Sequence, residues 1–124
     1  MQTGRVTQDN VSSIKFEDDY FKYAEFVDIT FEGGHITSDF AKCTFHNVDW
    51  YWGIFNIVNF VECEFIDCTF RGTAFADCKF VDCQFEGTRF KKDNLGGNCS
   101  FDGTVARNCT LSRTTGFDIP KKRS

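Results

Sequence analysis

The sequence has few of the residues on which catalysis, secretion or membrane insertion depend. Methionine and proline occur once each, and histidine occurs twice. No apolar run approaches the ~18 residues that a membrane-spanning helix needs. Residues 1–10 also lack the apolar stretch that follows a basic start in a secretory signal. We therefore expect a cytoplasmic protein of one domain that contacts no membrane.

The two histidines are also poorly placed for catalysis. His35 and His46 have no serine, aspartate or cysteine positioned to form a nucleophile–base pair with them. We predict that the chain is not an enzyme, that it has no catalytic or metal-binding residue, and that it needs no cofactor.

Charge is divided unevenly along the chain. Residues 1–67 hold 12 Asp and Glu against 4 Lys and Arg, whereas residues 68–124 hold 6 against 10. An acidic half followed by a basic half suggests a partner recognised by charge, although solvated surfaces can show the same division.

Phenylalanine is abundant, with 16 copies, and most copies recur every five residues. Twelve consecutive positions at this spacing, from Phe40 to Leu95, are large and apolar. The residue two positions before each of them is small, and Asp93 is the only charged residue in that set. Neither an α-helix nor a plain β-strand has a period of five.

A chain that turns a corner every five residues does have this period. We predict an all-β fold, a right-handed quadrilateral parallel β-helix of about five coils, in which four successive repeats make one coil. The large residues and the small residues two positions before them would point inward, and the other three residues of each repeat would point outward. Stacked coils would pair as parallel strands.

Two slips in register bound this run. Upstream, Phe16, Phe21, Phe26, Phe31 and Ile36 keep the period, and one residue is lost before Phe40. Downstream, one residue is gained in Gly96-Gly97-Asn98, after which the repeat continues to Leu111. We assign residues 1–124 to one domain, with an N-terminal cap over 1–15, coils over 16–111, and a C-terminal cap or tail over 112–124.

All seven cysteines occupy the small position two residues before a large one; they are Cys43, Cys63, Cys68, Cys78, Cys83, Cys99 and Cys109. The spacing from Cys63 to Cys83 superficially resembles a zinc site. Packing of a small, polarisable side chain beside each ring explains the pattern better than metal binding or disulfides do. An odd number of cysteines without a secretory context also favours free thiols.

The repeat resembles the pentapeptide-repeat family, as in residues 63–67, 68–72 and 78–82, and the resemblance covers about four fifths of the chain. It implies the quadrilateral β-helix. Known members include acidic rods that imitate duplex DNA in the binding groove of type II topoisomerases, and small phage-encoded inhibitors of CRISPR effectors. The resemblance therefore implies a partner that is a DNA-binding protein or nucleoprotein complex, in the host cytoplasm if a phage encodes the chain.

The outward positions then predict an acidic surface. We expect it to comprise Asp28, Glu32, Asp39, Glu62, Glu64, Asp67, Asp77, Asp82 and Glu86. The next side would be basic, with Arg71 and Lys91 in one column and Arg89 and Lys92 nearby. Ordered carboxylates on a rigid rod could compete with DNA phosphates for a basic groove, whereas simple solvation of the rod is the alternative.

A second outward group is apolar. Tyr51, Trp52, Ile54 and Ile57 fall within seven residues and would form one patch. Such patches often mark interfaces, although a docked N-terminal segment could cover this one.

Two functions follow. The first is a small inhibitor that mimics DNA with its acidic face, with a CRISPR effector favoured over DNA gyrase or another topoisomerase because the rod is short. The alternative is an immunity or scaffold protein that binds a protein partner through the aromatic patch. We expect no direct binding of nucleic acid, and either a monomer or an end-to-end homodimer.

Overall fold

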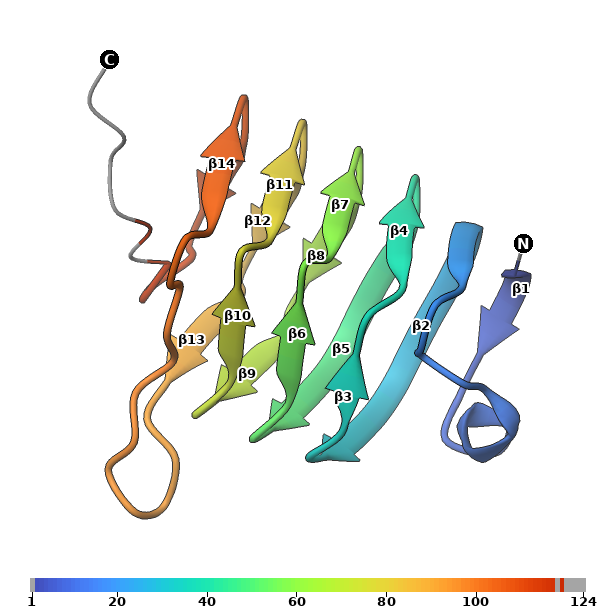
Figure 1. Cartoon of the computed structure of the whole chain (residues 1–124), viewed down its shortest axis with the longest axis horizontal. Helices are drawn as coiled ribbons and strands as arrows, with labels where there is room; N and C mark the ends of the chain where they lie inside the picture. The colour runs from blue at the N-terminus through green and yellow to red at the C-terminus, as the bar shows by residue number, and fades with distance from the viewer. Residues whose placement is uncertain (1, 118, 120–124) are drawn as a thin grey trace.

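The computed structural model describes residues 2–117 and 119, and it is an all-β parallel solenoid of about four turns. Figure 1 shows the strands of successive turns stacked side by side along the long axis. The first turn comprises β2 (Tyr20–Glu32) and β3 (His35–Ile36), and the second comprises β4 (Asp39–Ala41), β5 (Thr44–Tyr51) and β6 (Ile54–Asn56). The third comprises β7 (Asn59–Val61), β8 (Glu64–Ile66), β9 (Thr69–Arg71) and β10 (Ala74–Ala76). The fourth comprises β11 (Lys79–Val81), β12 (Gln84–Glu86), β13 (Arg89–Lys91) and a bridge at Ser100, and β14 (Val105–Arg107) and β15 (Thr110–Ser112) begin a fifth.

Each turn has four sides, which we number as faces. Face 1 contains the start of β2 and β4, β7, β11 and β14. Face 2 contains the middle of β2, the start of β5, and β8, β12 and β15. Face 3 contains the ends of β2 and β5 with β9 and β13, and face 4 contains β3, β6, β10 and the bridge at Ser100.

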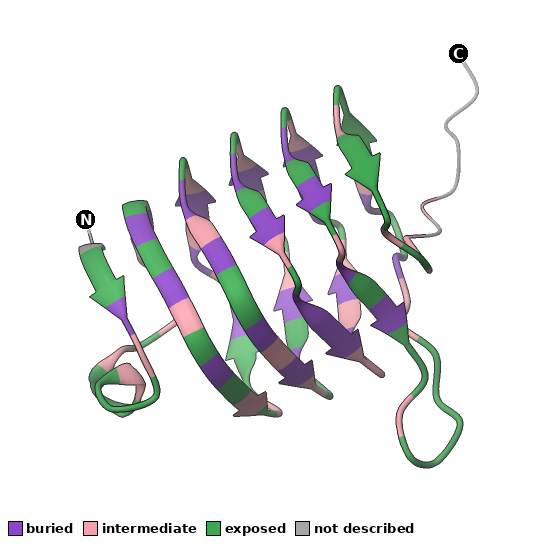
Figure 2. Cartoon of the chain, turned by 180° about the vertical axis from the view of Figure 1, so that it is seen from behind, coloured by how far each residue is buried: buried purple, intermediate pink, exposed green. Residues whose placement is uncertain are grey.

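The predicted aromatic core is confirmed on all four faces. Phe65 is 1% exposed, and its ring centroid lies 4.8 Å from those of Phe45 and Phe85, which are parallel to it within 6°. Figure 2 shows the resulting alternation of buried and exposed residues along β2 and β5. Because rings stack directly on rings of the neighbouring turn, the core is a set of four aromatic columns.

The first predicted slip is confirmed and the second is wrong. Phe21 pairs with Phe40, whereas four full repeats would pair it with Ala41, so the first turn is one residue short. Phe60 pairs with Phe80, four repeats later. Phe80 in turn pairs with Ala106, although four repeats would lead only to Ser100. The fourth turn therefore contains an insertion of six residues, not one.

Leu95 consequently lies outside the core, although its spacing predicts burial. It is 88% exposed, and Phe101 takes the place above Phe75, with ring centroids 5.3 Å apart. Residues 93–97 form a compact loop, because the Asp93 carboxylate accepts hydrogen bonds from the backbone N–H groups of Leu95 and Gly97. Because Leu95 is held in this loop, the larger side chain of Phe101 fills the aromatic column of face 4. We call residues 92–99 the inserted loop.

Single phenylalanine rings close both ends of the core. Phe16 lies outside the strands, 5.4 Å from Phe21 and 5.6 Å from Phe31. Phe117 lies 4.6 Å from Phe85 and 5.3 Å from Phe80. Before the first turn, β1 (Gln2–Val6) pairs with β2 and is followed by a short 3-10 helix, η1 (Val11–Ser13). Residues 1, 118 and 120–124 of the expected caps lie outside the described residues.

Candidate functional site

The corners of the coil impose a backbone requirement on the outer surface. Corner residues adopt the left-handed conformation, with φ of 51–60° at the non-glycine positions from Asp18 to Asp82. Aspartate and asparagine enter this region several times more readily than most residues do. Asp28, Asp67, Asp77 and Asp82 therefore suit the fold at corners. Glu62, by contrast, occupies a corner without that conformational reason.

Face 2 and its two corners bring together six of the nine predicted acidic residues. Asp82 lies above Glu62 on one corner, and Asp28 and Asp67 lie on the other. Glu64 and Glu86 project from the strands between these corners. Glu25 on β2 joins them, directly in line with Thr44 and Glu64. We call these seven residues the acidic face: Glu25, Asp28, Glu62, Glu64, Asp67, Asp82 and Glu86.

The other three predicted acidic residues lie elsewhere. Glu32 is on face 3, where it pairs with Tyr51. Asp39 is on face 1, and its carboxylate accepts a 2.9 Å hydrogen bond from the backbone N–H of Asn59. Asp77 is at the corner between faces 4 and 1, with its carboxylate against Gly103. These three carboxylates therefore do not extend the acidic face.

All seven carboxylates of the acidic face are exposed, and few cations oppose them. Arg5 on β1 pairs in register with Glu25, Lys42 lies in the corner column of Glu62, and Arg113 lies above Gly87 at the other corner. The guanidinium of Arg113 lies 2.6 Å from the Glu86 carboxylate. Because both partners are well exposed, this pair contributes at most about 1 kcal/mol. The formal charge of the acidic face with these three cations is −4.

The aromatic patch is covered in part by the inserted loop and not by the N-terminal segment. The Trp52 indole N–H donates a 2.7 Å hydrogen bond to the Asp93 carboxylate, and the Tyr51 hydroxyl donates to the Asn94 side chain. The backbone N–H of Gly97, together with the Trp52 indole, holds the pKa of Asp93 below its usual value. Tyr51 and Trp52 thus hold the inserted loop against the solenoid.

Ile54 and Ile57, on face 4 and at the corner that follows it, are exposed together with part of Trp52. Their exposed fractions are 48% and 64%. Ile57 has φ of 53°, a conformation that is unfavourable for a β-branched residue. The fold alone therefore gives no reason for isoleucine at this corner.

The thiols lie inside the coils, as the repeat predicts. Five of the seven cysteines are buried, Cys99 and Cys109 are half-buried, and all are free. Each thiol donates a weak hydrogen bond to a carbonyl of the turn below, as Cys68 does to Phe45 at 3.2 Å. Thr88 does the same with its hydroxyl, to the Phe65 carbonyl at 3.0 Å. The small inward position therefore caps a carbonyl as well as filling space.

Burial also makes Cys63, Cys68 and Cys78 poor nucleophiles. Desolvation raises the pKa of Cys68 to about 12 and that of Cys78 to about 11. Hydrogen bonding to Cys43 and Cys83, together with burial, raises the pKa of Cys63 as well. These cysteines offer packing and not reactivity.

The described residues contain no cluster of three or more His, Cys, Asp or Glu side chains that could hold a metal ion. His35 and His46 are both exposed, on faces 4 and 2. Within the same residues, no helix combines the length and apolar character required to span a membrane. The lack of enzymatic activity stays a prediction.

The geometry defines a parallel β-solenoid with four-sided coils and an aromatic core. A sequence model of pentapeptide repeats matches residues 55–92 in eight copies, which lie in the second to fourth turns. This match, the period of five and the solenoid together identify residues 55–92 as pentapeptide repeats within a β-solenoid that continues on both sides of them. No curated protein matches the chain significantly.

Proposed function

We propose that this protein is a non-enzymatic inhibitor that binds a DNA-binding protein or nucleoprotein complex, with the acidic face taking the place of DNA phosphates. The observation that carries the proposal is the gathering of seven exposed carboxylates on face 2 and its corners, opposed by three cations among the described residues. Three of the four glutamates, Glu25, Glu64 and Glu86, lie on strands and have no corner conformation to satisfy.

The charge density supports this proposal. Neighbouring turns of a β-solenoid are ~4.8 Å apart, so four turns span roughly 19 Å. Seven carboxylates over that length give one charge per about 3 Å, compared with one per about 1.7 Å of duplex DNA. The paired strands beneath fix the spacing, so binding would require little ordering of the acidic face.

A CRISPR effector is the favoured target over DNA gyrase or another type II topoisomerase. The solenoid has about four turns, which is short for filling a DNA-binding saddle but sufficient to block one DNA-reading groove. We propose that the residues of the acidic face contact this target.

The proposal predicts that neutral glutamine at the four glutamates weakens binding. The Glu25→Gln, Glu62→Gln, Glu64→Gln and Glu86→Gln variant would be compared with wild type on the partner isolated by affinity capture. We expect a loss of about 10-fold or more in affinity at low salt, with a smaller loss as salt rises. The melting temperature should change little, since all four side chains are exposed.

A matched control would neutralise the opposite charge, with Arg89→Gln and Lys91→Gln on face 3. We expect this control to bind the partner as wild type does. Full binding by the glutamine variant, together with loss of binding by the control, would overturn DNA mimicry by the acidic face.

The alternative is an immunity or scaffold protein that docks a protein partner through Ile54, Ile57 and the exposed part of Trp52. The unfavourable backbone conformation of Ile57 supports this alternative, because strained residues on a protein surface often belong to binding sites. Ile57→Asn should stabilise the fold by about 0.5–1 kcal/mol, since asparagine accepts the corner conformation more readily. If the patch is the interface, the same change should also abolish binding, and unchanged binding would exclude this alternative.

A further inference from the structure

A group of four cations lies around face 3, outside the acidic face. Arg71 and Lys91 pair in register on β9 and β13, and Arg89 projects from the same strand as Lys91. Lys92 follows at the start of the inserted loop. We call Arg71, Arg89, Lys91 and Lys92 the basic strip.

The basic strip is free to bind anions. Arg89, Lys91 and Lys92 are exposed, and no residue of the strip forms an ion pair with any other residue that the structure describes. Arg71 is half-buried, and its guanidinium carbon lies 5.5 Å from the centre of the Tyr51 ring. This cation–π contact fixes the direction of one charge without neutralising it.

Carboxylates near the basic strip are few and mostly engaged. Asp93 accepts hydrogen bonds from Trp52 and from the backbone of the inserted loop. Asp49 lies one turn below on face 3, in line with Thr69, and Glu32 lies one turn lower still. Within face 3, the turn that bears Arg89 and Lys91 therefore presents positive charge, and Glu86 at the end of β12 is paired with Arg113.

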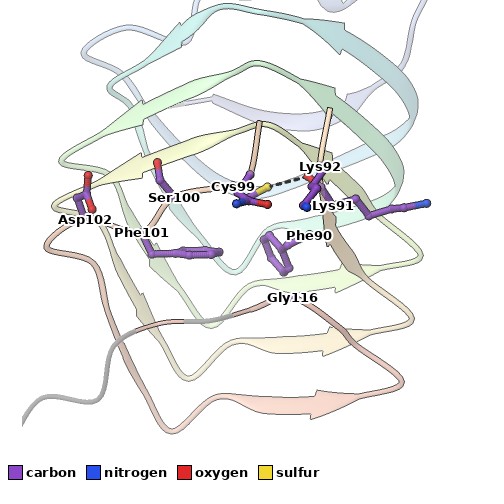
Figure 3. Close-up of a pocket in the computed structure, with 9 residues that line it drawn as sticks. Phe90, Lys91, Lys92, Cys99, Ser100, Phe101, Asp102 and Gly116 are labelled. Carbon is purple, nitrogen blue, oxygen red and sulfur yellow. Dashed lines mark hydrogen bonds between the residues drawn. The ribbon is translucent and has the colours of Figure 1, made fainter. Parts of the chain in front are cut away.

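A hollow of about 550 Å³ adjoins the basic strip, between β13 and the residues that follow the inserted loop. Lys91, Lys92, Asn98 and Ser100 supply its polar groups, and Asp102 is its one acidic residue. In Figure 3, Phe90 and Phe101 lie between Lys91 and Asp102, and both rings belong to the core, with exposed fractions of 7% and 6%. The hollow thus offers hydrogen-bonding groups beside a row of cations.

We propose that face 3 binds single-stranded nucleic acid, with phosphates along the basic strip and the edge of one base against the hydrogen-bonding groups of the hollow. A positively charged surface that follows the backbone is a feature of proteins that bind single strands without strict sequence preference. A flat β-face has no element that could enter the major groove of a duplex, whereas a single strand can lie across it. The overall negative charge of the sequence argues against such binding, but the fold separates that charge onto another face.

The test uses the full chain and a fluorescein-labelled single-stranded DNA of about 12 nucleotides, with binding followed by fluorescence anisotropy between about 50 and 200 mM salt. Four phosphate contacts predict that the logarithm of the association constant falls by about 3 per tenfold rise in salt. Arg89→Gln with Lys91→Gln should reduce that slope by about 1.4. The control, Glu62→Gln with Glu64→Gln, should bind the oligonucleotide at least as tightly as wild type does.

Absence of binding at the lowest salt would overturn the proposal, as would binding that the Arg89 and Lys91 changes leave intact. Tighter binding of a duplex of equal length would overturn the assignment to single strands. A strip that binds only an acidic protein would leave the oligonucleotide free, and that result also rejects the proposal. No partner protein is present in this test, so its outcome is independent of DNA mimicry by the acidic face.

Discussion

Replacing Phe65 with alanine is expected to lower the free energy of unfolding by about 3–5 kcal/mol. The ring is 1% exposed and lies between the rings of Phe45 and Phe85, with Phe60 at 5.6 Å. Strands of neighbouring turns are paired through their backbones, so the turns cannot close the gap that a missing ring leaves. Chemical denaturation followed by circular dichroism measures the change.

Gln84→Ala is the matched control for Phe65→Ala. Gln84 is exposed, lies on face 2 one turn above Glu64, and faces outward beside Phe85. Its truncation should change the free energy of unfolding by less than about 0.5 kcal/mol. Equal destabilisation by the two substitutions would show that the assignment of inward and outward positions is wrong.

Raising the pH from about 8 to 11 is expected to remove about 3–5 kcal/mol of stability through Cys68 and Cys78 alone. Burial raises the pKa of Cys68 to about 12 and that of Cys78 to about 11, from a usual value near 9. Above pH 9 the unfolded chain loses these protons while the folded chain keeps them. The contribution of these two thiols to the free energy of unfolding is therefore fully present below pH 9 and is lost as the pH rises.

Threonine provides a variant that removes the titration and keeps the packing. Thr88 occupies an equivalent inward position and caps a carbonyl as Cys68 and Cys78 do. Cys68→Thr with Cys78→Thr should therefore flatten the loss of stability between pH 9 and 11, measured as the melting temperature at each pH. Parallel pH profiles for the variant and wild type would exclude the two thiols as its cause.

Much of the fold was predictable because one pattern specifies the whole core. A period of five in large side chains, with a small residue two positions earlier, has few other structural explanations. The prediction even covered Gly53, whose place beside Trp50 has no room for a side chain. A Cβ atom there would lie 2.6 Å from the indole ring.

The inserted loop was not predictable from the same pattern. Leu95 keeps the period of five, and the glycines after it read as a single-residue slip. What decides the structure is the hydrogen bonding of Asp93 to Leu95, Gly97 and Trp52, which joins residues 41 positions apart. A spacing rule contains no such contact. For the same reason the loop's position against Tyr51 and Trp52 was not predictable.

Outer surfaces were predicted less completely than the core. A step of four repeats places Asp82 above Glu62 correctly, but the short first turn brings Glu32 into line with Tyr51 on face 3. Asp39 lies on face 1, where a step of four repeats leads to Asn59. Glu25 was missed, although the one-residue deficit of the first turn brings it into line with Thr44. Thr69 also faces outward, yet it is 2% exposed, between Asp49 and Arg89 on neighbouring turns.

The most direct measurement of the central claim is competition between this protein and duplex DNA for the isolated partner. Labelled DNA would be bound to the partner, wild-type protein would be titrated in, and free DNA would be followed by anisotropy. If the acidic face occupies the DNA groove, the protein displaces the DNA completely, and the Gln variant of Glu25, Glu62, Glu64 and Glu86 displaces it at least about 10-fold less effectively. A stable ternary complex of partner, DNA and protein would contradict DNA mimicry.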